Sequence, residues 1–287
     1  MREVDSPPGR TTLMPYWDRV ASRYAAADPL GAVCYPAAPP WFNRFYAYFQ
    51  LLAVERLLAG HTFAGIQALD VGCGSGRWCR WMTAKGAHVT GVDPTAAMLE
   101  AARKLSTGVR FEPMSATELA FPPESFDLVT AITVIQHLES AEQERAAAAM
   151  VRVLRPGGTL FVFDLIDRRD PGRIVFPRAP EEWIALYRGL GLELVRWEGQ
   201  EFVPLIRALM GLLSLRRKKE ASTAEVSAPS MLEQVGRRQW MFLPLWPIIQ
   251  VSYPLEVLCE RTLPAASARH GCFLFRKPLG PDGPRTP

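Results

Sequence analysis

The sequence predicts an α/β fold: a doubly wound, largely parallel β-sheet with helices on both faces. Two observations indicate this class. Between residues 61 and 202, short apolar runs typical of buried strands alternate with longer segments whose apolar residues have helical spacing. The first apolar run ends in three closely spaced glycines, Gly72, Gly74 and Gly76, and a helical segment follows them. Alternation of this kind produces parallel strands joined by crossover helices.

The first 60 residues precede this alternation. Residues 1–15 are polar and are expected to be disordered. In the segment 16–30, aromatic and apolar residues recur on one helical face, and 41–60 has a strong helical pattern that ends at Gly60. We therefore expect a first unit, 1–60, made of an N-terminal tail and helices that cover the core as a lid.

The core unit is expected at 61–202, and its elements follow from apolar runs bounded by glycine, proline and polar residues. Pro94 suits the first turn of its helix because the ring fixes φ near the helical value. Arg155-Pro-Gly-Gly158 is typical of a turn. Ligands of parallel sheets bind at the carboxyl ends of the strands, so the glycines are expected at the site. Strands are expected at 63–72, 88–93, 109–114, 124–133, 159–166 and 192–202, and helices at 76–86, 94–105, 141–154 and 180–191.

After residue 202 the alternation stops, and residues 203–269 are expected to form a helical insertion before the last strand. Alternating apolar residues at 270–278 predict that strand, within a final unit 270–287 whose end is expected to be disordered. The insertion comprises, in order, an apolar helix (203–215), a basic run (216–219), a flexible linker (219–230) and an aromatic, proline-rich segment (240–258).

Composition narrows the function classes. The net charge is +4 and the only dense basic run is 216–219, so nucleic-acid binding is not indicated. The five cysteines form no CxxC pair and have no histidine at ligand spacing, so we expect no disulfide framework, no metal site and a reducing cytoplasm. The N-terminus lacks the apolar core of a signal peptide. Three prolines interrupt 240–258, which argues against a spanning helix there.

The glycine loop does not match either common phosphate-binding motif. A P-loop needs Lys and Ser or Thr after its last glycine, whereas Arg77 and Trp78 follow Gly76. A dinucleotide loop has the spacing G-x-G-x-x-G, and here the third glycine comes one residue early. A nicotinamide-dependent oxidoreductase is therefore disfavoured, although glycine loops vary and this alternative stays open.

Two carboxylates near the glycine loop indicate which kind of ligand it holds. Asp70 precedes the loop, where it would repel a pyrophosphate and suit a positively charged ligand. Asp93 ends the second expected strand, where an acidic residue accepts hydrogen bonds from ribose hydroxyls. The loop is therefore expected to hold a nucleoside with a cationic, non-phosphate appendage. S-adenosylmethionine (SAM), which carries ribose, adenine, a sulfonium and an amino-acid tail, fits this description.

At this point the sequence resembles the class I SAM-dependent methyltransferases, in particular their small-molecule subgroup. The resemblance extends from about Tyr16 to Phe202. It implies a Rossmann-like seven-stranded sheet with an antiparallel last strand, SAM as cofactor and S-adenosylhomocysteine as product. Four segments in order carry it: ALDVGCGSGRW, VTGVDPTAAMLEAAR, SATELAFPPESFDLVTAITVIQHL and RVLRPGGTLFVFD.

The resemblance also implies a cofactor site. The family commonly has an aspartate at the start of its adenine loop, whereas this chain has Ser115 followed by Ala116. A serine hydroxyl can still accept a hydrogen bond from the adenine amino group. The expected cofactor-binding residues are Tyr24, Asp70, Gly72, Gly74, Gly76, Asp93, Pro94, Met98, Ser115, Ala116 and Ile132.

Aromatic residues of the first helix are candidates for a lid over the cofactor. Tyr16, Trp17 and Tyr24 either cover SAM, with Tyr24 as the better contact, or anchor the helix to the core. Cys73 lies inside the glycine loop, where a small residue packed beneath the cofactor is expected rather than a nucleophile.

Histidines are the candidate bases. His137 follows the fourth expected strand, so it either removes a proton from an acceptor hydroxyl or only frames the pocket. His270 is a weaker candidate for the same pocket. His61 and His88 flank strands at the opposite end of the sheet and are expected to be structural.

The acceptor is expected to be a small, partly apolar molecule. The preferred reaction is methylation of a hydroxyl oxygen on a natural product, a quinone-like compound or a lipid-linked compound. N- or C-methylation and SAM binding without catalysis remain alternatives. The segment 203–258 is expected first to cap such a substrate, second to add a helical layer, and third to contact a membrane surface.

Overall fold

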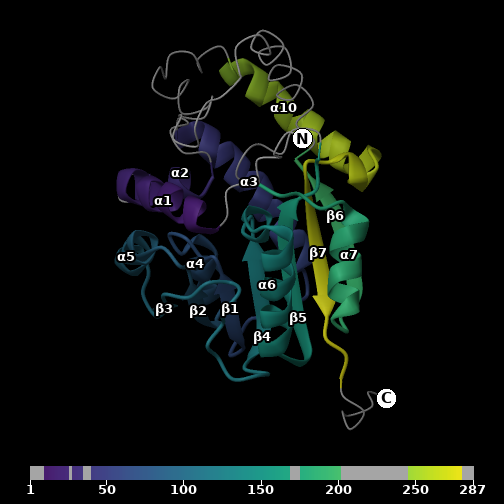
Figure 1. Ribbon diagram of the computed structural model, residues 1–287. Coiled ribbons are helices and arrows are strands. Elements are labelled where there is room, and N and C mark those ends of the chain that lie inside the picture. The colour runs from purple at the N-terminus through teal and green to yellow at the C-terminus, as the bar shows by residue number, and fades with distance from the viewer. Residues whose placement is uncertain (1–9, 26–27, 35–39, 169–174, 202–244, 280–287) are drawn as a thin grey trace, which may run out of the picture.

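The computed structural model places most of the chain. It describes residues 10–25, 28–34, 40–168, 175–201 and 245–279. The apolar helix, basic run and linker predicted within 203–230, and the tail predicted after 279, lie outside these residues. The described part is a sheet covered on both faces, with helical segments beyond the carboxyl ends of its parallel strands (Figure 1).

The sheet has seven strands in the order β3-β2-β1-β4-β5-β7-β6 (Figure 1). Strand β7 pairs antiparallel with β5 and β6, and the other neighbouring strands are parallel. The predicted fold class is confirmed, including the antiparallel last strand. The strands are β1 Gln67–Val71, β2 His88–Val92, β3 Arg110–Glu112, β4 Phe126–Ile132, β5 Leu154–Leu165, β6 Glu193–Gln200 and β7 His270–Arg276.

Helices cover both faces of this sheet, as its crossover connections require. Side chains of α6 and α7 pack on one face, whereas α3, α4 and α5 pack on the other. The helices are α1 Arg10–Val20, α2 Pro29–Val33, α3 Pro40–Leu57, α4 Arg77–Ala84, α5 Ala96–Leu105, α6 Ser140–Val153, α7 Pro180–Gly189 and α10 Leu245–Thr262, with a π-helical turn at Ala21–Ala25 and 3-10 turns at Ile135–His137 and Ala265–Ser267.

The two central strands explain why the core forms. Leu128 of β4 and Phe161 of β5 have no exposed surface, and neither do Val129 and Val162, which face the opposite side of the sheet. Continuous apolar runs of this kind are typical of parallel strands buried on both faces. Each fully buried side chain of this size contributes about 1.5–3 kcal/mol. The chain order reverses between β1 and β4, which is where such sheets bind ligands.

The N-terminal segment differs from the prediction. Residues 10–15 are helical, not disordered, because Pro15 removes only the helical hydrogen bond to the Thr11 carbonyl and the other residues tolerate a helix. The single helix expected at 16–30 is divided into α1, the π-helical turn and α2. The Asp28 side chain accepts from the Gly31 N–H at 3.0 Å, so Asp28 and the following proline start a new helix.

Two boundaries in the core also differ. Leu154 still pairs with Phe126, so β5 begins before the predicted turn at 155–158, which becomes an irregular part of the strand. Thr95 caps α5, so Pro94 precedes that helix instead of lying in its first turn. The aromatic, proline-rich segment predicted at 240–258 is helical from residue 245 as part of α10. Among the described residues, no helix is long and apolar enough to cross a membrane.

Candidate active site

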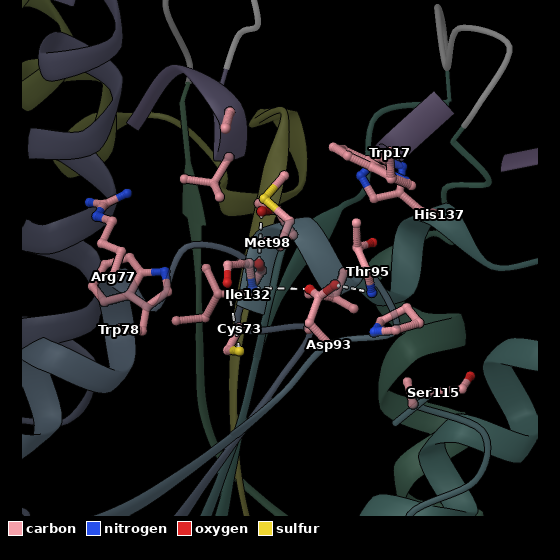
Figure 2. A pocket seen from close by; sticks show the side chains of 18 of the residues that line it. Trp17, Cys73, Arg77, Trp78, Asp93, Thr95, Met98, Ser115, Ile132 and His137 are labelled. Atoms are coloured by element: carbon pink, nitrogen blue, oxygen red, sulfur yellow. Dashed lines mark hydrogen bonds between the residues drawn. The ribbon is translucent and has the colours of Figure 1, made fainter. Parts of the chain in front are cut away.

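A pocket lies at the carboxyl ends of β1, β2 and β4, where the chain order of the sheet reverses. It encloses about 1180 Å³, part of which is open to solvent. Arg77 and Trp78 lie at one end, Trp17 and His137 at the other, and Asp93 lies between them (Figure 2). The pocket therefore lies where sheets of this kind bind their ligands.

The glycine loop after β1 approaches its neighbours too closely for side chains. Gly72 has φ 68°, and a Cβ atom there would lie 2.5 Å from the Cγ atoms of Val134. Gly76 has φ 75° and begins α4, and a Cβ atom there would lie 3.0 Å from Cζ of Phe111. Gly72 and Gly74 line the pocket, whereas the structure places Gly76 outside the lining. The absence of a side chain at the third glycine, Gly76, therefore allows the start of α4 to lie close to Phe111 of β3.

Asp93 is the buried carboxylate of the pocket. One of its oxygens accepts from the Gly74 N–H at 3.0 Å, and the other accepts from the Thr95 N–H at 2.8 Å (Figure 2). Burial raises the pKa of Asp93, and these backbone hydrogen bonds oppose the shift because they favour the ionised form. Asp93 therefore holds the glycine loop and the start of α5 in place and also faces the pocket.

Asp70 has a different environment from the one that the sequence suggested. Its oxygens accept from Thr130 Oγ1 at 2.8 Å and from Cys79 Sγ at 3.3 Å, and the side chain is outside the pocket lining. Burial raises the pKa of Asp70 to about 6. The carboxyl group supports the loop from below, so the expected direct contact with a cationic ligand has no support in this geometry.

Five further residues of the expected cofactor site border the pocket. Pro94, Met98, Ala116 and Ile132 line it together with Ser115. The Ser115 hydroxyl also accepts from the Thr117 N–H at 3.3 Å, so this side chain shapes its own turn as well.

Two aromatic lid candidates have different positions, Trp17 in α1 and Tyr24 in the π-helical turn. Trp17 lines the pocket, whereas the structure places Tyr24 outside it, against the cluster that contains Met98 and Ala101. The reason is the division of the N-terminal helix, which gives the two aromatic side chains different directions. Tyr16 packs against Trp17 with ring centroids 5.1 Å apart.

His137 ends the 3-10 turn that follows β4, and three features fix its place. Thr133 has φ 57°, rare for a β-branched residue, which turns the chain sharply after the strand. The buried Asp164 carboxylate accepts from the Val134 N–H at 3.0 Å and from the Gln136 N–H at 3.3 Å. The ring of His137 packs edge-on against Trp17 with centroids 5.0 Å apart (Figure 2).

The other histidines lie elsewhere. His270 was considered for the same pocket, but it is outside the lining and its Nδ1 lies 3.2 Å from Oε2 of the buried Glu201. His270 pairs with Leu165 at the carboxyl end of β5, so it lies at the same end of the sheet as the pocket, but β5 separates β7 from β4, whose end borders the pocket. His61 and His88 lie at the amino ends of β1 and β2, opposite the pocket, as expected.

The described residues include Cys73 and the side chains that could serve as metal ligands. Cys73 is buried in the loop beside Cys79, and desolvation contributes to raising the pKa of its thiol, which suits a packing residue. Within the described residues, no group of three or more His, Cys, Asp or Glu side chains could hold a metal ion.

Sequence reasoning missed the cationic end of the pocket. Arg77 donates to the Gln50 side chain at 2.7 Å and to the Ala47 carbonyl at 2.6 Å, and its guanidinium lies 4.2 Å from the Trp78 ring centroid. The sequence feature that could have revealed this end of the pocket is Arg77 itself, which directly follows the last glycine at the start of a helix.

The side chains of the pocket fit SAM. A carboxylate lies between apolar side chains that suit a nucleoside, and Arg77 suits the carboxylate of an amino-acid tail. Besides Arg77 and His137, no basic side chain lines the pocket among the described residues, and Asp93 and Glu142 supply negative charge. A diphosphate is therefore a poor fit, which disfavours the dinucleotide alternative.

Comparison with known proteins gives a family. Residues 69–162 match a family described as a methyltransferase domain. Ubiquinone biosynthesis O-methyltransferases from Marinobacter nauticus and Hahella chejuensis are 37% and 34% identical, over 43% and 50% of this chain. The chain spans 53% and 69% of their respective lengths. The crystal structure of the cyclase SpnF has a TM-score of 0.57 and 20% identity, covering 96% of this chain and 98% of that one, which shows the shared fold.

The fold, the pocket and these relatives define a class I SAM-dependent methyltransferase, and the chain belongs to that family. SAM is the cofactor of this family. This membership also overturns the alternative of a nicotinamide-dependent oxidoreductase.

Proposed function

We propose that the protein transfers the methyl group of SAM to a hydroxyl oxygen of a small, partly apolar acceptor. The observation that carries this proposal is the pocket with a nucleoside-binding carboxylate in its middle and a histidine beneath an aromatic lid at one end. In this arrangement Asp93 binds the ribose hydroxyls and Arg77 binds the amino-acid carboxylate. Gly72 and Gly74 let the backbone approach the ligand.

SAM supplies an electrophilic methyl group whose departure leaves a neutral thioether. The protein's contribution is then alignment of the acceptor and exclusion of water, which can lower a barrier by up to about 7–11 kcal/mol in favourable cases. A hydroxyl acceptor also has to lose its proton. His137 is the candidate base, since Asp164 holds its turn from below and Trp17 packs against its ring.

The relatives support oxygen as the methylated atom and a quinone-related ring as one acceptor class, since both are named ubiquinone biosynthesis O-methyltransferases. Trp17, Val134 and Leu138 give the acceptor end of the pocket an apolar wall, which agrees with this class. Methylation of nitrogen or carbon remains the alternative within the family.

We assign the acceptor cap to residues 203–269, between the core 61–202 and the last strand. The support is α10, which lies across the same end of the molecule as α1 and α2 (Figure 1). The units 1–60 and 270–287 complete this proposed organisation. A cap of this kind favours acceptors with an apolar tail.

The proposal is tested by incubating the protein with methyl-labelled SAM and a panel of matched acceptors. The panel contains catechols with alkyl tails of increasing length and anilines with the same tails. We expect label on the catechol oxygen and a KM that falls as the tail lengthens. Label only on nitrogen, or no label on any acceptor, would overturn the O-methyltransferase proposal.

Replacing Trp17 by alanine is expected to raise the KM for the acceptor by about fivefold to tenfold, because an aromatic contact and its buried surface are lost. The affinity for SAM should change less, since the ribose contact remains. Steady-state kinetics measure the first effect and calorimetry the second. The matched control is Tyr48→Ala, which removes an exposed aromatic side chain of α3. Equal effects of the two substitutions would refute the lid assignment.

A further inference from the structure

A second hollow lies behind the glycine loop, separate from the proposed acceptor end of the active site. It encloses about 740 Å³, part of it open to solvent, between the start of α2, the start of α3 and α4. Arg44 of α3 and Arg77 and Arg80 of α4 line it. Two helices distant in sequence, α3 and α4, therefore bring three arginines to one concave surface.

These arginines have no negatively charged partner among the residues that the structure describes. Arg80 donates to the Ser75 carbonyl at 2.7 Å and to the Ser106 hydroxyl at 3.3 Å, and Arg77 also bonds only to neutral acceptors. Within the part of the chain that the structure describes, none of the three guanidinium groups forms an ion pair. Burial lowers the pKa of Arg77 and Arg80, which is the direction expected for partly desolvated cations without compensating carboxylates.

One carboxylate, Asp28, also lines the hollow. Its Oδ1 accepts from the Gly31 N–H at 3.0 Å, so this side chain caps α2. In the protein without SAM, three arginines and one aspartate give the hollow a formal charge of about +2, and Arg77 is shared with the active-site pocket, where it is proposed to bind the carboxylate of SAM. A phosphate group carries a charge of about −1.5 to −2 near neutral pH, so it matches this charge better than a single carboxylate does.

We propose that this hollow is a binding site for a phosphate group, either free phosphate or the phosphate of a small phosphomonoester. Arginine suits this ligand because its planar guanidinium donates two parallel hydrogen bonds to phosphate oxygens. Arg44 is exposed and has no hydrogen-bond partner among the described residues, so it is free to close over the ligand from the α3 side.

The test is calorimetric titration of the full-length protein with inorganic phosphate and with glycerol 3-phosphate, at constant ionic strength in sodium chloride. We expect saturable binding of phosphate that acetate does not reproduce. Tighter binding of glycerol 3-phosphate would identify a phosphomonoester as the ligand, and equal binding would identify free phosphate. No saturable binding of either compound would overturn the proposal.

Variants locate the site. Arg44→Gln and Arg80→Gln should each weaken phosphate binding by at least about tenfold, because each removes a charged donor. Asp28→Asn should strengthen it, since asparagine keeps the helix cap but removes the repelling charge. The control is Arg110→Gln on β3, an exposed arginine paired with Glu112 outside the hollow. Unfolding temperatures in sodium chloride report whether each variant folds, and Arg44→Gln decides the outcome because, among the described residues, its side chain forms no hydrogen bond or ion pair that the fold would lose. Unchanged binding in folded Arg44→Gln would assign the phosphate to an adventitious surface site and refute the proposal.

Discussion

Replacing Asp93 by alanine is expected to weaken SAM binding by at least about 100-fold, equivalent to about 2.8 kcal/mol. The carboxylate is proposed to accept hydrogen bonds from the ribose, and bonds to charged groups contribute about 1.5–3 kcal/mol each. It also accepts from the Gly74 and Thr95 N–H groups, so the substitution releases the glycine loop. Calorimetric titration with SAM and S-adenosylhomocysteine measures the effect.

Two further variants separate ligand binding from folding. Glu100→Ala removes an exposed carboxylate of α5 and should leave SAM affinity unchanged. Asp93→Asn keeps the shape but can offer only one oxygen to the two backbone donors, so an intermediate loss is expected. An Asp93→Ala protein that unfolds like the wild type and binds SAM equally well would remove Asp93 from the proposed site.

The second large effect is expected for His137→Ala. Loss of a general base typically lowers turnover between about 100-fold and 10 000-fold. With a hydroxyl acceptor, kcat should fall in this range while the affinity for SAM stays nearly unchanged.

The control for this prediction uses the ring contact with Trp17. His137→Phe keeps an aromatic ring against the lid but cannot accept a proton, so its kcat should fall as far as that of His137→Ala. Near-wild-type turnover in His137→Phe would show that the ring only frames the pocket. This result would favour an acceptor that needs no base, such as an amine.

The order of strands and helices in the core was predictable from the sequence because apolar periodicity and glycine breaks are local signals. The N-terminal boundaries were less predictable. Only the Asp28–Pro29 pair marks the start of α2, and the apolar spacing of 16–30 equally fits a single helix. The path of β5 through 155–158 depends on pairing with Phe126, which no local pattern contains.

The positions of the site residues were also only partly predictable from the sequence. Asp70 and Asp93 both stand near strand ends, and the sequence does not reveal that one carboxylate bonds to Thr130 beneath the loop while the other faces the pocket. The alternation of side chains along a strand does not show which of the two carboxylates lines the pocket, because the loop after β1 covers one side of that strand. Trp17 and Arg77 enter the pocket from helices whose positions depend on tertiary packing.

Titration of the full-length protein with SAM, S-adenosylhomocysteine and NAD tests the central claim most directly. The account predicts saturable, one-site binding of SAM and S-adenosylhomocysteine and no binding of NAD. Failure of SAM to bind a folded protein, or binding of NAD in its place, would contradict the assignment of this pocket.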